Sequence, residues 1–177
     1  MKIAILGVGN ILLKDEGVGV HLVRALQRLP LPEGVEVIEG GTSPEAIYLA
    51  AGYDKLIIVD AACGGGQPGT VYRLTLGEIE LDGGLALSSH ELGLFQSLLA
   101  LRPEERPKEV VLLGIEPKEL DGGLELSPEL EAKLEELCQE VLRECECEDG
   151  SGPAPAEVRA LLGPDRGGAR FSRRTRP

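Results

Sequence analysis

Glu16, Asp60 and His90 are the side chains of this sequence that are best placed to form a reaction centre. Glu16 opens a helical pattern after the first predicted strand, Asp60 ends the third strand, and His90 comes at the start of a later helix. Because ligands of open α/β sheets bind outside the carboxyl ends of the strands, we expect the three side chains to meet at one rim. Two carboxylates and an imidazole can hold a divalent first-row metal and leave positions open for water or substrate. The sequence thus predicts a metal site that is assembled from three separate loops.

Each of these residues also has an ordinary structural interpretation. An acid such as Asp15 or Glu16 can simply cap a helix, and Asp60 can end its strand in a turn. His90 can be a solvated side chain in the first turn of its helix. No local motif joins the three positions, so it is their combination that favours a functional site.

Other polar residues are weaker candidates. Cys63 could be a nucleophile activated by His90, although a small buried thiol is the commoner role for such a cysteine. His21 lies within a helical pattern, where we expect an ordinary, partly exposed histidine. Asn10 suits a turn with positive φ.

Familiar nucleotide-binding and hydrolase motifs are missing from the sequence. Gly7 and Gly9 resemble the start of a dinucleotide fingerprint, but Leu12 stands where its third glycine should be, so a nicotinamide cofactor is not expected. The chain has no G-x-x-x-x-G-K-[ST] loop, no G-x-S-x-G and no H-E-x-x-H. The site therefore has to be built from residues that lie far apart in the sequence.

Short apolar runs alternate with amphipathic helical patterns along the chain. Such alternation predicts a three-layer α/β fold, with a mostly parallel twisted sheet of about five strands and helices on both faces. The run at 70–76 alternates apolar and polar residues, as expected for a half-exposed, antiparallel strand. Strands are predicted at residues 2–8, 35–38, 55–60, 70–76 and 109–115, and helices at 15–29, at 44–51, from 88 onward and from 127 onward.

Charge and composition narrow the possible partners. The 177 residues carry 30 acidic and 18 basic side chains, a net charge of −12, and only 3% of them are aromatic. Residues 151–177 hold six Arg against Glu157 and Asp165, a balance of +4, which leaves −16 on residues 1–150. A basic groove or a stacking platform for nucleic acid is therefore not expected in the main body. We divide the chain into an α/β domain at 1–148 and a poorly ordered tail, rich in Gly, Pro and Arg, at 149–177.

Cysteine usage and the absence of long apolar runs favour a cytoplasmic location. The four cysteines form no C-x-x-C pair, so neither a disulfide framework nor a zinc knuckle is expected. The N-terminal apolar run has only four residues before the first glycine, too few for a signal peptide. No run approaches the roughly 18 apolar residues that a membrane span needs. We expect a cytoplasmic protein with reduced thiols and no membrane partner.

A series of short motifs runs in order through residues 2–145. It consists of Gly7-Val8-Gly9-Asn10-Ile11-Leu12-Leu13 leading into Asp15-Glu16-Gly17-Val18-Gly19, then Gly40-Gly41-Thr42, Ile57-Ile58-Val59-Asp60, Pro68-Gly69-Thr70, Ser89-His90-Glu91-Leu92-Gly93-Leu94 and Leu113-Gly114-Ile115-Glu116-Pro117. The series closely resembles the landmarks of the hydrogenase maturation endopeptidases, which trim the large subunit of nickel-iron hydrogenases. The opening motif followed by the ordered Asp and His is the most specific part of the resemblance.

The resemblance implies an endopeptidase that removes a short C-terminal extension from the large-subunit precursor once nickel is in place. In that family, the residues matching Glu16, Asp60 and His90 form the metal-binding and catalytic centre, and the stretch matching Gly40, Gly41 and Thr42 would shape a substrate-facing loop. The nickel is expected to come with the substrate, and zinc or another divalent ion could take its place in the free protein. Water activated by the metal is the expected nucleophile. We expect the enzyme to be a monomer.

Two other functions share part of this pattern. A non-catalytic chaperone that binds the nickel-loaded subunit would use the same three side chains and release an uncut product. A peptidyl-tRNA hydrolase is suggested by the Gly-x-Gly-Asn opening, but the acidic body and the scarcity of aromatic residues disfavour a tRNA substrate.

Overall fold

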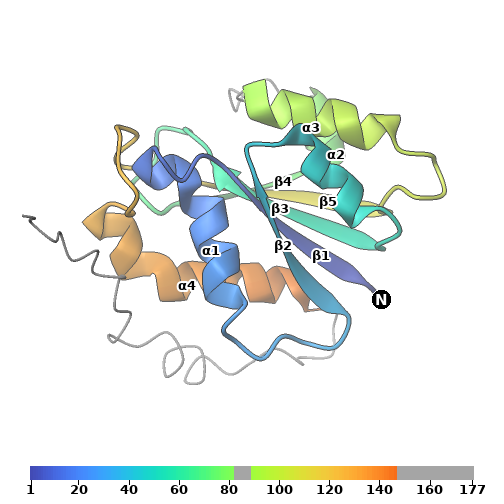
Figure 1. Cartoon of the computed structure of the whole chain (residues 1–177), viewed down its shortest axis with the longest axis horizontal. Helices are drawn as coiled ribbons and strands as arrows, with labels where there is room; N and C mark the ends of the chain where they lie inside the picture. Colours follow the sequence, from blue (N-terminus) through green and yellow to red (C-terminus); the bar gives the residue numbers. More distant parts are fainter. Residues whose placement is uncertain (82–88, 147–177) are drawn as a thin grey trace, which may run out of the picture.

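A five-stranded sheet forms the centre of the molecule (Figure 1). The computed structural model describes residues 1–81 and 89–146. Four of the strands are parallel, and the strand at one edge is antiparallel to its neighbour, which confirms the predicted α/β class and the antiparallel strand at 70–76. In the order in which they lie side by side, the strands are β2 (Val35–Gly41), β1 (Ile3–Val8), β3 (Lys55–Ala61), β5 (Glu109–Ile115) and the antiparallel β4 (Val71–Thr75).

Helices cover both faces of this sheet, as predicted (Figure 1). One face carries α1 (Val18–Leu26) and α4 (Pro128–Cys145). The other face carries the 3-10 helix η2 (Pro44–Ala50) and α3 (Ser89–Ala100). The short helix α2 (Leu76–Leu81) directly follows β4. Within the described ranges, no helix combines the length and the apolar character needed to cross a membrane.

Successive side chains of a strand point to opposite faces of the sheet, and this divides the core into two halves. Ile3 and Ile5 of β1 pack with residues of α1 and α4, whereas Ala4 and Leu6 of the same strand pack with residues of η2 and α3. Every residue of β1 is buried. Parallel strands that are covered on both faces have nearly continuous apolar sequences, which is why β1 and β3 could be recognised from sequence.

The first helix differs from its prediction. Instead of one helix over residues 15–29, the chain forms the 3-10 helix η1 (Lys14–Gly17), and α1 then ends at Leu26. The side chain of Asp15 does not cap a helix but accepts hydrogen bonds from a distant loop, and this holds η1 in its tighter winding. The segment predicted as a helix at 44–51 is also a 3-10 helix.

The last helix begins as predicted. Ser127 is its N-cap, and the Ser127 Oγ accepts a hydrogen bond from the N–H of Leu130 at 3.4 Å. Two ranges lie outside the described part of the chain. Residues 82–88 include the predicted start of a helix at Ser88, and residues 147–177 include the whole predicted tail at 149–177.

Candidate active site at the carboxyl ends of the strands

Glu16 owes its position to the buried acid that precedes it. Asp15 is fully buried, and its carboxylate accepts hydrogen bonds from the backbone N–H groups of Lys118 and Glu119, both at 2.9 Å, and of Ser127 at 2.7 Å. Burial alone raises the pKa of Asp15, but these hydrogen bonds outweigh it, so that the pKa lies below its ordinary value. Asp15 therefore fixes η1 to the loop between β5 and α4. Glu16, which is half-buried, is left at the rim of the sheet.

Asp60 is a buried acid at the same rim. It is the second-last residue of β3 and is 4% exposed, and its Oδ1 accepts a hydrogen bond from the N–H of Ala61 at 2.8 Å. Burial, followed by the charges of Glu91 and Glu16, raises the pKa of Asp60 to about 8. At neutral pH this carboxyl group is therefore mostly protonated in the metal-free protein.

Gly9 allows the first loop to pass close to both acids. A Cβ atom at this position would lie 1.9 Å from the backbone O of Glu16 and 3.4 Å from Asp60 Oδ1. The φ of Gly9 is 125°, a value that residues with side chains rarely adopt. The structure thus brings Glu16 and Asp60 together at the ends of β1 and β3.

His90 is the second residue of α3. Its side chain lies outside the described residues, so His90 is located only by its position in the first turn of that helix. The next residue, Glu91, is 2% exposed and close enough to raise the pKa of Asp60. The first turn of α3 therefore lies beside Asp60, at the end of the sheet where the sequence predicted a site.

Glu91 is an acid of this rim that the sequence-based prediction did not include in the site. In the structure its carboxylate is buried near Asp60. A signal was present in the sequence: Glu91 precedes Leu94 and Phe95 by three and four residues, and both of these are buried. Helical periodicity therefore places Glu91 on the inward face of α3, where an acid is unusual.

Gly40, Gly41 and Thr42 reach the rim at the end of β2. The backbone O of Gly41 accepts a hydrogen bond from the N–H of Gly9 at 2.8 Å, and Thr42 is exposed. Gly40 has a packing role, because a Cβ atom there would lie 2.9 Å from Leu6 Cδ1. The segment lies where a substrate-facing loop would have to be, and its contact with substrate stays a prediction.

Glu116 and Tyr72 hold the loop that follows β3. Glu116 is buried, and its Oε2 accepts hydrogen bonds from the N–H of Gly64 at 2.7 Å and from the hydroxyl of Tyr72 at 2.8 Å. The N–H of Gly66 donates to the Tyr72 hydroxyl at 2.9 Å. The loop lies so close to the Tyr72 ring that a Cβ atom at Gly64 would be 2.4 Å from it.

Cys63 is exposed, so the expectation of a small buried thiol is wrong. The loop after β3 follows the Tyr72 ring instead of entering the core, and residues 63–67 therefore remain at the surface. Burial, then the charges of Glu116 and Glu91, raise the pKa of the Cys63 thiol. A raised pKa lowers the thiolate fraction, which disfavours the nucleophilic role as well.

Asn10 has a structural role, and His21 lies apart from the candidate site in α1. The Oδ1 of Asn10 accepts a hydrogen bond from the N–H of Leu12 at 2.9 Å. The expected positive φ at Asn10 is wrong because its side chain makes the turn, and Lys14 is the one non-glycine residue with positive φ in the described ranges. His21 is partly exposed, as expected, and burial followed by the charge of Arg24 lowers its pKa.

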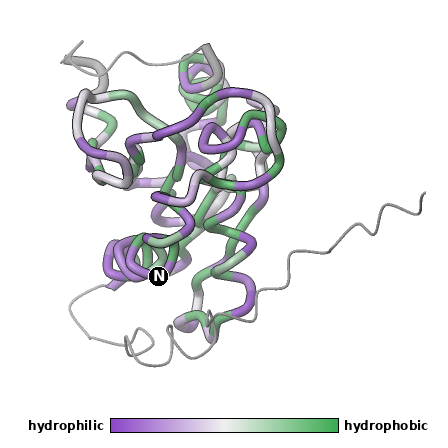
Figure 2. Tube along the Cα trace, turned by 90° about the vertical axis from the view of Figure 1, so that its left-hand side faces the viewer, coloured by the Kyte–Doolittle hydropathy of each residue, from purple (hydrophilic) through white to green (hydrophobic). Residues whose placement is uncertain are grey.

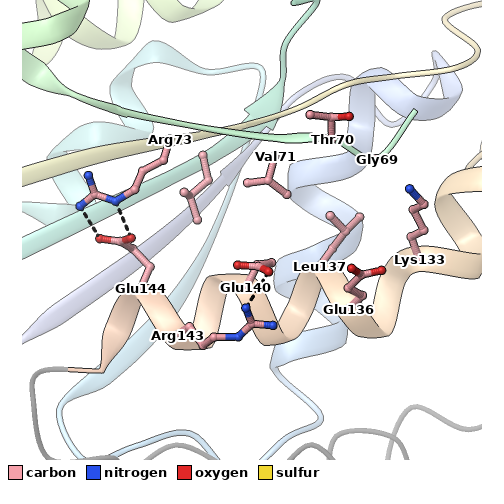
Figure 3. Close-up of a pocket in the computed structure, with 11 residues that line it drawn as sticks. Gly69, Thr70, Val71, Arg73, Lys133, Glu136, Leu137, Glu140, Arg143 and Glu144 are labelled. Carbon is pink, nitrogen blue, oxygen red and sulfur yellow. Dashed lines mark hydrogen bonds and ion pairs between the residues drawn. The ribbon is translucent and has the colours of Figure 1, made fainter. Parts of the chain in front are cut away.

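A groove between β4 and α4 contains none of the predicted site residues (Figure 3). Its volume is about 540 Å³. Its charged side chains largely bind one another: Arg73 donates to Glu144 at 2.8 and 2.9 Å, and Arg143 donates to Glu140 at 2.7 Å. These pairs leave the acids of the rim as the better candidate for chemistry.

The donor atoms at the rim are of the types that bind a divalent metal. Glu16 and Asp60 supply carboxylate oxygens, and His90 can supply an imidazole nitrogen. In the part of the chain that is described, which lacks the His90 side chain, no group of three or more His, Cys, Asp or Glu is arranged as a metal site. The metal-binding role of the three residues is therefore a proposal, taken up below.

The fold is a three-layer α/β protein with acids gathered at the carboxyl ends of its parallel strands, and comparison with known proteins identifies the family. The sequence pattern described as hydrogenase maturation protease matches residues 20–144. The hydrogenase 2 maturation protease of Escherichia coli strain K12 is 42% identical over 146 residues, which cover 80% of this chain and 89% of that protein. The chain belongs to the hydrogenase maturation protease family.

Solved structures show the same relationship. The hydrogenase maturating endopeptidase HybD from Escherichia coli superposes with a TM-score of 0.71 at 41% identity, over 82% of this chain and 94% of that one. HybD from Thermococcus kodakarensis, a nickel-iron hydrogenase maturation protease, gives a TM-score of 0.70 at 29% identity, over 82% of this chain and 100% of that one. These comparisons confirm the resemblance that the motifs suggested and place the chain among peptidases.

Proposed function

We propose that this protein removes the C-terminal extension of a nickel-iron hydrogenase large-subunit precursor after nickel has been inserted. The nickel arrives as part of the substrate, and Glu16, Asp60 and His90 bind it. Family membership supports a peptidase that acts in hydrogenase maturation. The more specific proposal, nickel recognition by these three residues, depends on the geometry of the rim.

The observation that carries the proposal is the convergence of buried and half-buried acids around Asp60. Asp60 is 4% exposed and Glu91 2% exposed, and the loop at Gly9 brings the half-buried Glu16 close to Asp60. Acids gathered in a buried place repel one another when ionised. A divalent cation stabilises the ionised carboxylates and offsets this repulsion. A simple turn at the end of β3 would not require such an arrangement.

The arrangement makes nickel a condition for cleavage. A precursor that carries nickel can bridge to Glu16, Asp60 and His90, whereas a precursor without it lacks this contact. A bound divalent metal can polarise the scissile carbonyl or a water molecule. The residues of this chain orient the substrate against the strand ends, where Gly41 and Thr42 lie at the edge of the site.

Mass spectrometry of the precursor tests the proposal. The purified protein is incubated with nickel-loaded precursor and, separately, with nickel-free precursor, and we expect a shorter product only from the loaded form. Asp60→Ala and His90→Ala should each abolish processing while far-UV circular dichroism shows an intact fold. Asp54→Ala is the matched control, because Asp54 is an acid near the opposite end of the sheet, where it accepts a hydrogen bond from the N–H of Lys2 at 2.8 Å.

Two outcomes would contradict the proposal. An unchanged precursor mass with the wild-type protein under all conditions would favour the assembly chaperone over the protease. Full activity of both the Asp60→Ala and His90→Ala variants would remove these residues from the mechanism.

A further inference from the structure

Two loops beside the candidate site are joined into one surface, which we call the double loop and define as residues 10–17 and 116–127. The N–H of Lys14 donates to the O of Gly123 at 2.9 Å, and the N–H of Gly123 donates to the O of Leu12 at 2.9 Å. Asp15 adds its three side-chain hydrogen bonds to the second loop. Figure 1 shows the second loop beside η1 at the left of the molecule.

The double loop exposes three leucines. Leu12 is 60% exposed, Leu120 is 46% exposed and Leu124 is 64% exposed. The parallel pairing of Leu13 with Gly123 brings the stretches that carry Leu12 and Leu124 together. Figure 2 views the molecule from this side, and hydrophobic segments occur there among hydrophilic ones. Several exposed large apolar side chains on two joined loops are typical of a site where another molecule binds.

Three of the charged side chains of the double loop pair with one another. Lys14 forms ion pairs with Glu119 and, at 3.2 Å, with Asp121. A cavity of about 450 Å³ lies next to Leu124. Its lining is mixed, with Leu126 and Pro128 beside the charged side chains of Lys14, Glu119 and Glu125. The surface therefore offers a partner protruding leucines and an adjacent recess.

The double loop is also held in a fixed shape. The carboxylate of Asp15 is fully buried and accepts three backbone hydrogen bonds from the second loop. A surface that is already ordered loses little conformational entropy when a partner binds.

We propose that the double loop is the docking surface for the folded large-subunit precursor, with Leu12, Leu120 and Leu124 contacting apolar residues near the precursor's nickel. This inference rests on the proposed function. Leu12 precedes Glu16 by four residues, a distance of at most about 14 Å along an extended chain. A protein whose metal reaches Glu16 must therefore lie against the double loop. A second copy of this chain in the same place would cover Glu16 and exclude the substrate.

Binding of the nickel-free precursor isolates this surface, since that form lacks the metal contact and is not cut. Its dissociation constant is measured by biolayer interferometry for wild type, Leu12→Ser, Leu124→Ser and the double variant. Burial of one leucine corresponds to a change of about tenfold in affinity, so we expect about tenfold weaker binding for each single variant and about a hundredfold for the double variant. With nickel-loaded precursor, the same variants should raise KM and leave kcat unchanged.

Leu49→Ser is the matched control. Leu49 is 61% exposed, close to the exposure of Leu12, but it lies on η2 on the opposite face of the sheet. This variant should bind and process the precursor as wild type does. Urea unfolding of all variants should give the wild-type midpoint, because the replaced side chains are exposed.

Three results would overturn the inference. The first is that the precursor does not bind to wild type, and the second is that the double variant binds it with wild-type affinity. The third is that wild type forms a dimer in analytical ultracentrifugation, and that the double variant is a monomer that still binds the precursor as wild type does. If wild type binds the precursor but never cuts it, and the leucine variants bind it more weakly, the docking surface is supported while the protease function fails. If wild type cuts the precursor and the variants do so with an unchanged KM, the protease function stands and the docking surface fails.

Discussion

Replacing Asp60 by Asn should change how the stability of the protein depends on pH. The pKa of Asp60 rises from an ordinary value of 3.8 to about 8 because of burial and then the charges of Glu91 and Glu16. Between these two values Asp60 is ionised in the unfolded chain and protonated in the folded protein. The folded state therefore holds the extra proton, and the free energy of unfolding falls as pH rises through this window. The stabilisation is fully present below the lower value and is lost by the upper one.

The size of the effect follows from the width of the window. One pH unit corresponds to about 1.4 kcal/mol, so wild type should lose about 2.7 kcal/mol of stability relative to Asp60→Asn between about pH 5 and pH 7. A domain is typically stable by about 5 to 15 kcal/mol, which makes this loss easy to detect. The amide of the variant cannot ionise, yet it retains an oxygen that can accept the hydrogen bond from the N–H of Ala61.

Urea unfolding in the presence of a chelator, followed by circular dichroism at several pH values, measures this difference. The quantity of interest is the slope of the difference against pH, because any constant cost of burying the amide cancels from it. Asp54→Asn is the control: the pKa of Asp54 is lowered, first by the N–H of Lys2, so this group is ionised in both states across the window and should give no slope. Adding nickel or zinc should then stabilise wild type more than Asp60→Asn.

A difference between wild type and Asp60→Asn that stays constant from about pH 5 to pH 7 would refute the reasoning. It would mean that the folded protein holds Asp60 ionised and that neither burial nor the neighbouring acids oppose its charge. A slope of the opposite sign would mean that an unrecognised cation stabilises the carboxylate.

Other substitutions test the structures around the rim. Asp15→Ala leaves three backbone N–H groups without their acceptor. The free energy of unfolding, measured with urea, should fall by about 3 kcal/mol or more. A loss below about 1 kcal/mol would contradict the anchoring role of Asp15. Tyr72→Phe removes the hydrogen bonds that the hydroxyl donates to Glu116 and accepts from Gly66. A loss of about 1 kcal/mol of local stability corresponds to amide hydrogen exchange at Gly66 that is about fivefold faster or more. Unchanged exchange at Gly66 would argue against this network. Cys63→Ala should process precursor at the wild-type rate in the mass assay, and a folded variant that has lost cleavage would instead favour a thiol nucleophile.

The sheet could be predicted because its signals are local. The segment of β3 up to Asp60 is an apolar run closed by an acid, and β4 alternates apolar and polar residues as a strand at the sheet edge does. Parallel strands end at one rim, so the neighbourhood of Glu16 and Asp60 also followed from the sequence. Exact helix types did not follow, because the tight winding of η1 depends on contacts with residues far along the chain.

The division of roles between neighbouring acids could not be predicted. Asp15 and Glu16 are adjacent and chemically similar, and only the backbone N–H groups of residues 118–127 determine which of them turns inward. Glu91 is a different case, because helical periodicity could have placed it on the buried face of α3. The exposure of Cys63 depends on how the loop after β3 meets Tyr72, which is a tertiary contact with no local signal.

The hydrogen bond between Asp15 and Ser127 joins residues that are 112 positions apart. During synthesis, a nascent chain that has released only its first strand and helix has none of the N–H donors that Asp15 needs. Glu16 therefore takes its final place only after the start of α4 has left the ribosome. Contacts of such long sequence separation form late because they close a large loop. The candidate site is thus completed only after most of the chain has been made.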